Sequence, residues 1–179
     1  MKNYLLAAVA GLLVVSTSAS AVSIYGSAGR KYTSWGVGMG TSTSGVALSG
    51  DWTRHNDNGY IADVGLGYNI PLGSALVTLG GKGLYLKPDQ GKTGYALAVG
   101  GGLSLPVTSS VSLFGQYYAA PDAFTSGVKS YEEALAGGRW TVFRPVTVEA
   151  GYRYMRLTDK NDDKNTMVDG PYLGVNAAF

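Results

Sequence analysis

Most of this chain repeats one pattern, a run of alternating apolar and small or polar residues followed by a turn. In "IADVGLGYNI", residues 61–70, the side chains of Val64, Leu66 and Tyr68 share one parity, while Gly65 and Gly67 lie on the other. A period of two places alternate side chains on opposite faces of an extended strand. The chain is therefore predicted to be all-β.

The same alternation recurs along the chain, in segments that each carry an apolar face. The stretch from residue 75 to 86 is ambiguous, because both of its faces are apolar around Lys82, and Phe114 departs from the alternation of its own segment. The apolar faces are Trp35, Val37 and Met39; Val46, Leu48 and Trp52; Tyr95, Leu97, Val99, Leu103 and Leu105; Val111, Leu113 and Tyr117; Ala134, Ala136, Trp140 and Val142; and Val146, Val148, Tyr152 and Tyr154.

The connections between these segments alternate in length. Short connections lie at 41–45, 71–74, 106–109 and 143–145, and longer polar ones at 54–59, 87–94, 120–130 and 158–170. Short periplasmic turns and longer extracellular loops are typical of an antiparallel up-and-down transmembrane β-barrel of the outer membrane.

A soluble exported β-sandwich is the alternative fold, since its strands alternate as well. The outward polar face of a sandwich should be rich in Lys, Glu and Thr, whereas the second face here consists largely of Gly, Ala and Ser with isolated charges. The apolar face also carries aromatic residues near segment ends, as Trp52, Tyr68, Tyr85, Trp140 and Tyr154 do, which matches the girdles of a membrane barrel. These features favour the barrel.

The number of strands follows from how residues 22–41 are read. Eight runs are clear from residue 45 onward, and "VSIYGSAG" and "TSWGVGMG" supply two more, so ten strands are preferred and eight remain the alternative. The last strand is expected in "GPYLGVNAAF", with Pro171 at its start and Leu173, Val175 and Phe179 facing lipid. A terminal Phe179 resembles the signal read by the barrel-assembly machinery, which makes it the predicted assembly signal.

Residues 1–21 are predicted to be a signal peptide that is removed, which leaves 22–179 as the barrel domain. Lys2 is followed by an apolar run from Leu5 to Val15 and by Ala19-Ser20-Ala21, the layout of a secretory signal with a cleavage site. A membrane anchor is the alternative, but this run is well short of the ~20 residues that span a bilayer.

Composition excludes several classes of function. The formal net charge is +2 without a basic stripe, which argues against nucleic acid as a partner. Cys is absent, so disulfides, thiolate metal sites and Cys nucleophiles are excluded.

Three segments resemble the YfaZ family of Gram-negative outer-membrane proteins: "RWTVFRPVTVEAGYRYMRL" at 139–157, "GGKGLYL" at 80–86 and "VDGPYLGVNAAF" at 168–179. The family is described as porins or outer-membrane proteins of poorly defined role. The resemblance therefore implies an outer-membrane location and a barrel, and it supplies no catalytic or ligand-binding residues.

Seven charged residues share the parity expected to face the lumen. Such charges either pair across a packed interior or line an aqueous path, and pairing is the preferred interpretation. The many inward Gly residues leave open a narrow porin-like channel for small solutes or ions. The seven are Asp51, Asp63, Lys82, Glu133, Arg139, Glu149 and Arg153.

An outer-membrane lipid-modifying or proteolytic enzyme is the alternative function, and it would need a rim histidine. His55 is the single His of the chain, with Asp57 two residues on, and a lone His in a polar loop is usually solvated. The segment from Asp159 to Gly170 lacks the Gly and Glu of a calcium loop. No catalytic residue, metal or cofactor is predicted, and the expected partners are outer-membrane lipid and lipopolysaccharide, met by basic residues such as Arg54 and Arg156, and the barrel-assembly machinery.

Overall fold

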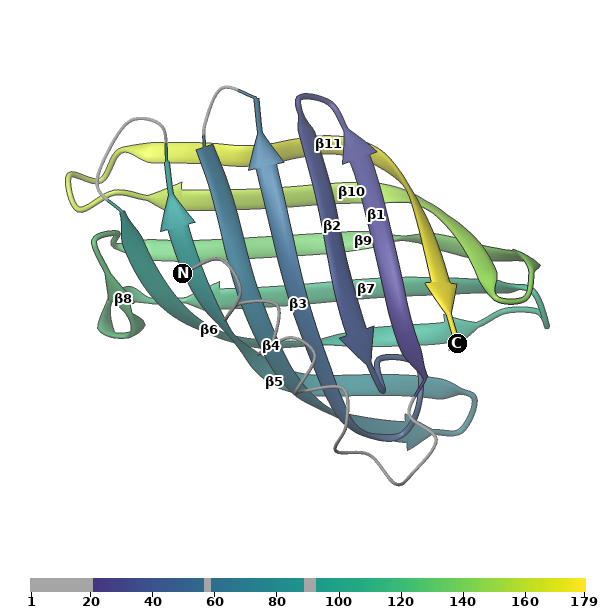
Figure 1. The fold of residues 1–179 in the computed structure, drawn as a ribbon. Coiled ribbons are helices and arrows are strands. Elements are labelled where there is room, and N and C mark those ends of the chain that lie inside the picture. The colour runs from purple at the N-terminus through teal and green to yellow at the C-terminus, as the bar shows by residue number, and fades with distance from the viewer. Residues whose placement is uncertain (1–20, 57–58, 89–92) are drawn as a thin grey trace, which may run out of the picture.

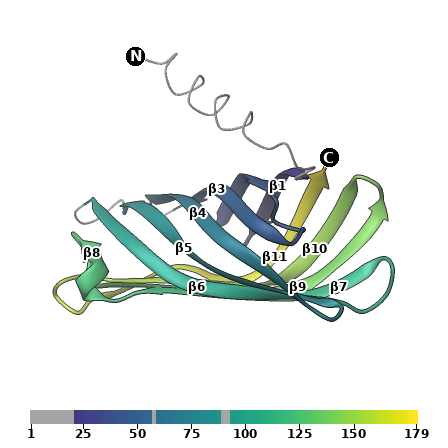
Figure 2. The ribbon, with the colours of Figure 1, turned by 90° about the horizontal axis from the view of Figure 1, so that it is seen from below.

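The computed structural model describes residues 21–56, 59–88 and 93–179, and these residues form a ten-stranded antiparallel barrel (Figures 1 and 2). The wall strands are β1 (Val22–Gly29), β2 (Tyr32–Met39), β3 (Gly45–His55), β4 (Gly59–Leu72), β5 (Ala75–Lys87), β6 (Gly94–Pro106), β7 (Val111–Ala120), β9 (Ser130–Phe143), β10 (Val146–Thr158) and β11 (Lys164–Ala178).

The barrel is closed by the pairing of its first strand with its last. Strands β1 and β11 pair from Ser23↔Ala178 to Gly29↔Tyr172, while every other wall strand pairs with the wall strands next to it in the chain. The main chains of Val22 and Phe179 exchange two hydrogen bonds, of 3.0 and 2.8 Å. The prediction of ten strands is therefore confirmed, and both the eight-stranded alternative and the soluble sandwich are wrong.

A short segment outside the wall follows β7. The 3₁₀ helix η1 (Asp122–Phe124) leads into β8 (Thr125–Ser126), which pairs with Tyr95 and Ala96 of β6. The pairing of β6 with β7 ends at Val99↔Ala119, so β8 covers the edge of β6 that β7 leaves free. The segment sits at one end of the barrel (Figure 2).

The predicted loop at 158–170 is much shorter in the structure. Strand β10 continues to Thr158 and β11 begins at Lys164, because the polar residues of this stretch pair with one another as a protruding hairpin. A register shift beside Met155 makes Met167 an extra residue of β11.

Pro171 therefore lies within β11 and does not begin it, contrary to the sequence prediction. It pairs with Tyr152 of β10 and comes just beyond Gly29↔Tyr172, the last pair between β1 and β11. The missing N–H of proline is tolerated there, because β11 has no further partner on the β1 side.

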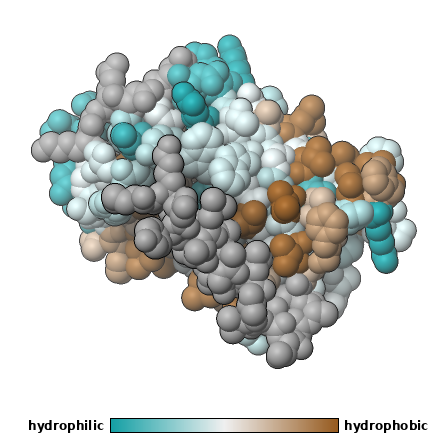
Figure 3. All heavy atoms as spheres, viewed as in Figure 1, coloured by the Kyte–Doolittle hydropathy of each residue, from teal (hydrophilic) through white to brown (hydrophobic). Residues whose placement is uncertain are grey.

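The outward face of the wall is apolar, as the alternation predicts. Val64, Leu66, Leu173 and Val175 are all more than half exposed. In Figure 3, hydrophobic residues gather on the right and lower sides, and hydrophilic residues gather at the upper left, the side of the longer loops in Figure 1. Within the described residues, no helix combines the length and apolarity that a membrane-spanning helix needs.

Aromatic side chains form a continuous row across five neighbouring strands, β2 to β6. Neighbouring ring centroids in this row are separated by 6.0, 6.1, 6.1 and 5.4 Å. Such a row is one side of an aromatic girdle, which marks a membrane–water interface. Its members are Trp35, Trp52, Tyr60, Tyr85 and Tyr95.

The two ends of the barrel can be assigned from their connections. The β2–β3, β4–β5, β6–β7 and β9–β10 turns lie at the end that also holds Val22 and Phe179, so this end is periplasmic. The longer connections lie at the extracellular end. One connection there is short, since Arg30 and Lys31 alone join β1 to β2, with Lys31 at a φ of 67°.

Candidate functional site in the barrel lumen

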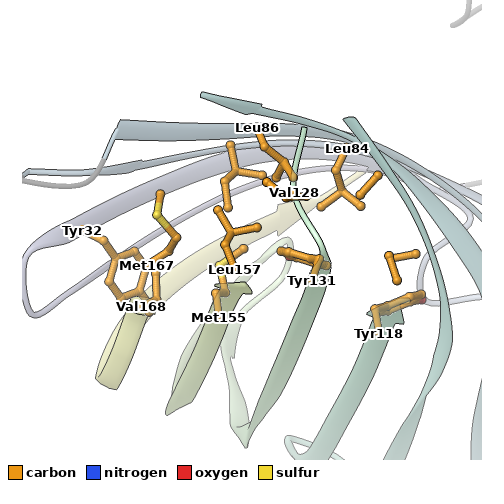
Figure 4. Close-up of a cluster of buried hydrophobic side chains, with 14 of the residues drawn as sticks. Tyr32, Leu84, Leu86, Tyr118, Val128, Tyr131, Met155, Leu157, Met167 and Val168 are labelled. Atoms are coloured by element: carbon orange, nitrogen blue, oxygen red, sulfur yellow. The ribbon is translucent and has the colours of Figure 1, made fainter. Parts of the chain in front are cut away.

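Apolar side chains fill the extracellular half of the lumen. They come from the extracellular ends of the strands and from Val128 in the β8–β9 connection, and they form one buried cluster (Figure 4). Tyr131, Leu86 and Met155 have no exposed surface. The cluster also contains Phe114 and Tyr172, and we call its other members the plug: Tyr32, Ile61, Leu84, Leu86, Ala96, Ala98, Tyr118, Ala120, Val128, Tyr131, Met155, Leu157, Met167 and Val168.

The local sequence explains how the plug is built. Leu84 and Leu86 are inward residues of β5, and the smaller Ala96 and Ala98 lie beside them on β6, so large and small side chains share the space. The register shift in β10–β11 turns both Met167 and Val168 inward, where they lie beside Tyr32 in Figure 4. Apolar packing therefore closes the lumen at this level.

A buried ion-pair network lies directly beneath the plug. Glu133 accepts hydrogen bonds from Lys82 Nζ at 2.8 Å and Arg153 Nη2 at 2.9 Å, and the Tyr131 hydroxyl donates to the same carboxylate at 3.1 Å. The side chains of Lys82, Glu133 and Arg153 are 10%, 4% and 8% exposed. One carboxylate thus links β5, β9 and β10 across the interior.

Asp51 and Asp63 face each other on neighbouring strands at the same level. They are direct partners in the β3–β4 register. The Tyr25 hydroxyl hydrogen-bonds to Asp51, and both side chains lie over Gly36, where a Cβ would come within 2.6 Å of the tyrosine ring and 2.7 Å of Asp51 Oδ1. Glycine at position 36 therefore makes room for this pair of side chains.

A second ion pair lies nearer the periplasmic end. Arg139 Nε donates to Glu149 Oε2 at 3.0 Å, and the guanidinium lies 3.9 Å from the ring centroid of Phe114. The two charged side chains are 29% and 15% exposed, so they are less buried than the Glu133 network. They form part of the lining of an open space.

That space is a cavity of about 350 Å³ that extends from the charged level to the periplasmic rim. Its lining is rich in hydroxyl and amide groups, together with Asp51, the Arg139–Glu149 pair and the network around Glu133. At the rim, Asn69 Nδ2 donates to the carbonyls of Gly40 and Thr43 at 2.8 and 2.7 Å, which holds the β2–β3 turn against the inner wall.

The structure places all seven sequence-predicted charged residues on the inner face. It joins Lys82, Glu133 and Arg153 in one network, pairs Arg139 with Glu149, and sets Asp51 opposite Asp63. Sequence reasoning missed the plug and the tyrosines at positions 25 and 131. Two features of the sequence could have indicated inward apolar side chains. One is that both faces of β5 are apolar, and the other is that Phe114, which is buried, breaks the alternation of its own segment.

The remaining candidates from the sequence lie away from the lumen cavity. His55 is the last residue of β3 and pairs with Tyr32 and Gly59 in the sheet register, while Asp57 is outside the described residues. The described residues contain no group of three or more His, Cys, Asp or Glu able to hold a metal. Asp159 accepts a hydrogen bond from the backbone of Lys160, as a residue of a tight loop does.

Comparison with known proteins agrees with this architecture. The family described as YfaZ precursor matches residues 1–179. The chain belongs to the YfaZ family. The outer membrane protein YfaZ of Escherichia coli strain K12 is 55% identical over 180 residues, which cover 100% of both chains. This member of the YfaZ family is accordingly an outer-membrane protein.

Two solved outer-membrane proteins are similar to this chain at low sequence identity. The outer membrane channel DcaP of Acinetobacter baumannii has a TM-score of 0.50 and 11% identity, over 92% of this chain and 55% of DcaP. The NanC porin has a TM-score of 0.45 and 12% identity, over 90% of this chain and 99% of NanC. The YfaZ-family chain thus shares the outer-membrane barrel fold with DcaP.

Proposed function

We propose that this protein is a structural barrel of the outer membrane, without enzymatic activity and without a permanently open pore. It spans the membrane with its ten strands and presents its connections at the cell surface. Its lumen is closed in the extracellular half and hollow in the periplasmic half.

One observation carries this proposal, namely the plug above the Glu133 network. Leu86, Tyr131 and Met155 have no exposed surface, and the carboxylate of Glu133 is held from two other strands. Opening a path would require removing packed apolar side chains from their contacts, at about 1.5–3 kcal/mol for each fully buried side chain. A porin of the ordinary kind has a polar interior filled with water.

Conductance in planar lipid bilayers tests the proposal. The purified protein should give flat traces at several voltages, because its plug leaves no path for hydrated ions. Discrete current steps from the unmodified protein would contradict it.

A narrow channel that opens when the plug is displaced is the second candidate. The observation in its favour is the cavity of about 350 Å³, which already provides the periplasmic half of a path. This candidate predicts that replacing Leu86 and Met155 with Ala produces current steps that Leu173→Ala on the outward face does not produce. Flat traces from the double variant would contradict the channel, and the structural role would be the candidate that remains.

The surroundings of the barrel are part of the same proposal. Arg54 is exposed and Arg156 is half-buried beside Glu132 near the extracellular end, where phosphate groups of lipopolysaccharide could pair with them. At the periplasmic end, Phe179 is 74% exposed, so its ring is accessible to the barrel-assembly machinery that we propose recognises it.

A further inference from the structure

An open groove lies on the outward face of the wall, beside the segment that leaves the barrel after β7. Its volume is about 650 Å³, within the range of sites that hold small molecules. Strands β4, β5 and β6 supply its floor, and η1 and β8 border it at one end of the barrel (Figure 2). The outward residues of the floor are Ala62, Val64, Gly83 and Leu97.

The groove presents apolar atoms to the membrane. Phe124 of η1 borders it and is 52% exposed. The hydroxyl of Thr125, which also borders it, donates to the Val128 carbonyl at 2.8 Å and is therefore already engaged. Gly83 keeps the floor open, because a Cβ there would meet only the carbonyl oxygen of Val64, at 4.0 Å. A flexible hydrocarbon chain therefore fits this groove better than a polar molecule does.

Two cations lie on the extracellular side of the aromatic row. Arg54 and Lys87 are the sheet partners of Tyr60 on β3 and β5, and both are exposed. Within the described residues neither forms an ion pair, and Lys87 Nζ lies 5.8 Å from the centroid of the Tyr60 ring. Neighbouring strands are about 4.8 Å apart, so both long side chains reach the space over Tyr60. Two adjacent cations are suited to binding a phosphate group.

The groove and the cations follow one another along β5. Lys87, Tyr85 and Gly83 occupy every second position of its outward face, so a cation, an aromatic ring of the row and the open floor come in that order. The aromatic row marks the membrane–water interface, which places Lys87 at the level of lipid head groups and Gly83 at the level of the acyl chains. This order matches the two parts of an anionic lipid.

We propose that the groove holds one acyl chain of lipopolysaccharide and that Arg54 and Lys87 bind a phosphate of the same molecule. Lipopolysaccharide is the lipid chosen because these residues face the extracellular leaflet, and its lipid A anchor carries phosphates next to its acyl chains. The assignment rests on the lipopolysaccharide contact proposed above for Arg54 and gives it a defined site. In this site η1 and β8 hold the chain against the wall.

Three lipids test the assignment. Native mass spectrometry on the mature barrel, refolded in detergent micelles without lipid, measures the dissociation constants of lipid A, of lipid A stripped of its phosphates, and of phosphatidylglycerol. We expect lipid A to bind at least about tenfold more tightly than the other two, a difference of about 1.4 kcal/mol.

A groove-filling variant locates the acyl chain. Gly83→Leu should weaken lipid A binding at least about tenfold, because the new side chain occupies the floor. Gly50→Leu is the matched control, since Gly50 lies in the same row of outward residues, joined to Gly83 through Val64, but outside the groove. The control should bind lipid A as the unmodified barrel does. If Gly83→Leu does not assemble, Ala62→Leu fills the same floor.

A charge variant locates the phosphate. Replacing both Arg54 and Lys87 with Gln should weaken lipid A binding at least about tenfold and should leave the weaker binding of the phosphate-free lipid unchanged. Arg144→Gln at the periplasmic end removes an exposed cation far from the groove and should have no effect on either lipid.

Several results would overturn the assignment. Equal binding of phosphatidylglycerol would indicate a site for anionic lipids in general, and equal binding of the phosphate-free lipid would show that the cations take no part. Undiminished binding by both groove-filling variants would place the chain elsewhere, and with a weakened charge variant it would leave only the contact at the rim. No binding of lipid A by the unmodified barrel would overturn both the groove and the rim contact. None of these results bears on conductance, which tests the closed lumen separately.

Discussion

The substitution Glu133→Gln measures how strongly the buried network holds the barrel together. It removes the one negative charge that faces both Lys82 Nζ and Arg153 Nη2, at 2.8 and 2.9 Å, while keeping the size of the side chain. Hydrogen bonds to charged groups contribute about 1.5–3 kcal/mol each. Removing one partner of a buried ion pair costs about 3–5 kcal/mol, because the remaining charges are left uncompensated.

The neighbouring residue provides a matched control. Glu132 pairs with Arg156 Nη2 at 2.6 Å, but it points outward, and the two side chains are 35% and 28% exposed. Glu132→Gln should therefore change the free energy of unfolding by about 0–1 kcal/mol.

Both variants can be compared with the unmodified barrel by urea titration in detergent micelles, followed by tryptophan fluorescence. The free energy of unfolding should fall by about 3–5 kcal/mol for the inward variant only. Equal and small losses in both variants would refute the reasoning, because they would show that the lumen at Glu133 is as well hydrated as the outer surface.

Four further predictions concern the plug, the aromatic row, the second ion pair and the terminus. Leu86→Ala should lower the free energy of unfolding by about 2–5 kcal/mol in the same titration, since this side chain has no exposed surface. Trp52→Ala should lower the free energy of unfolding more than Trp35→Ala does. Trp52 has aromatic neighbours on both sides, and each such pair contributes about 0.5–1.5 kcal/mol. Arg139→Ala should leave bilayer traces flat, because the plug lies above it; current steps would show that Arg139 itself blocks the path. Deleting Phe179 should reduce the amount of heat-modifiable barrel in the membrane fraction, and unchanged insertion would contradict its role in assembly.

The wall of the barrel could be predicted from the sequence because its constraints are local. Alternation fixes which side chains face outward, so Val64, Leu66 and Val175 were placed correctly without any knowledge of long-range contacts. The pairing of β1 with β11 follows from the barrel fold itself, because a closed barrel leaves no free edge.

The plug could not be predicted in the same way. Parity arguments assign apolar residues to the outside, so inward apolar residues such as Leu84 and Leu86 appear only as an ambiguity on a strand with two apolar faces. Strand ends that project beyond the membrane are hydrophilic, so their sequence is indistinguishable from that of a polar loop. For this reason β11 begins at Lys164, earlier than the sequence predicted. The partners of Glu133 come from β5 and β10, and only the closed barrel brings them together.

The central claim is that the lumen is dry above Glu133 and open to water below it. The chain has no cysteine, so single-cysteine variants need no further background changes. Met155→Cys places a thiol in the plug, Ser49→Cys places one in the cavity, and Val64→Cys on the outward face is a lipid-exposed control. A charged, membrane-impermeant thiol reagent applied to folded barrels in liposomes should label only the cysteine at position 49, and only from the periplasmic side. Labelling at position 155 from the extracellular side would contradict the closed lumen.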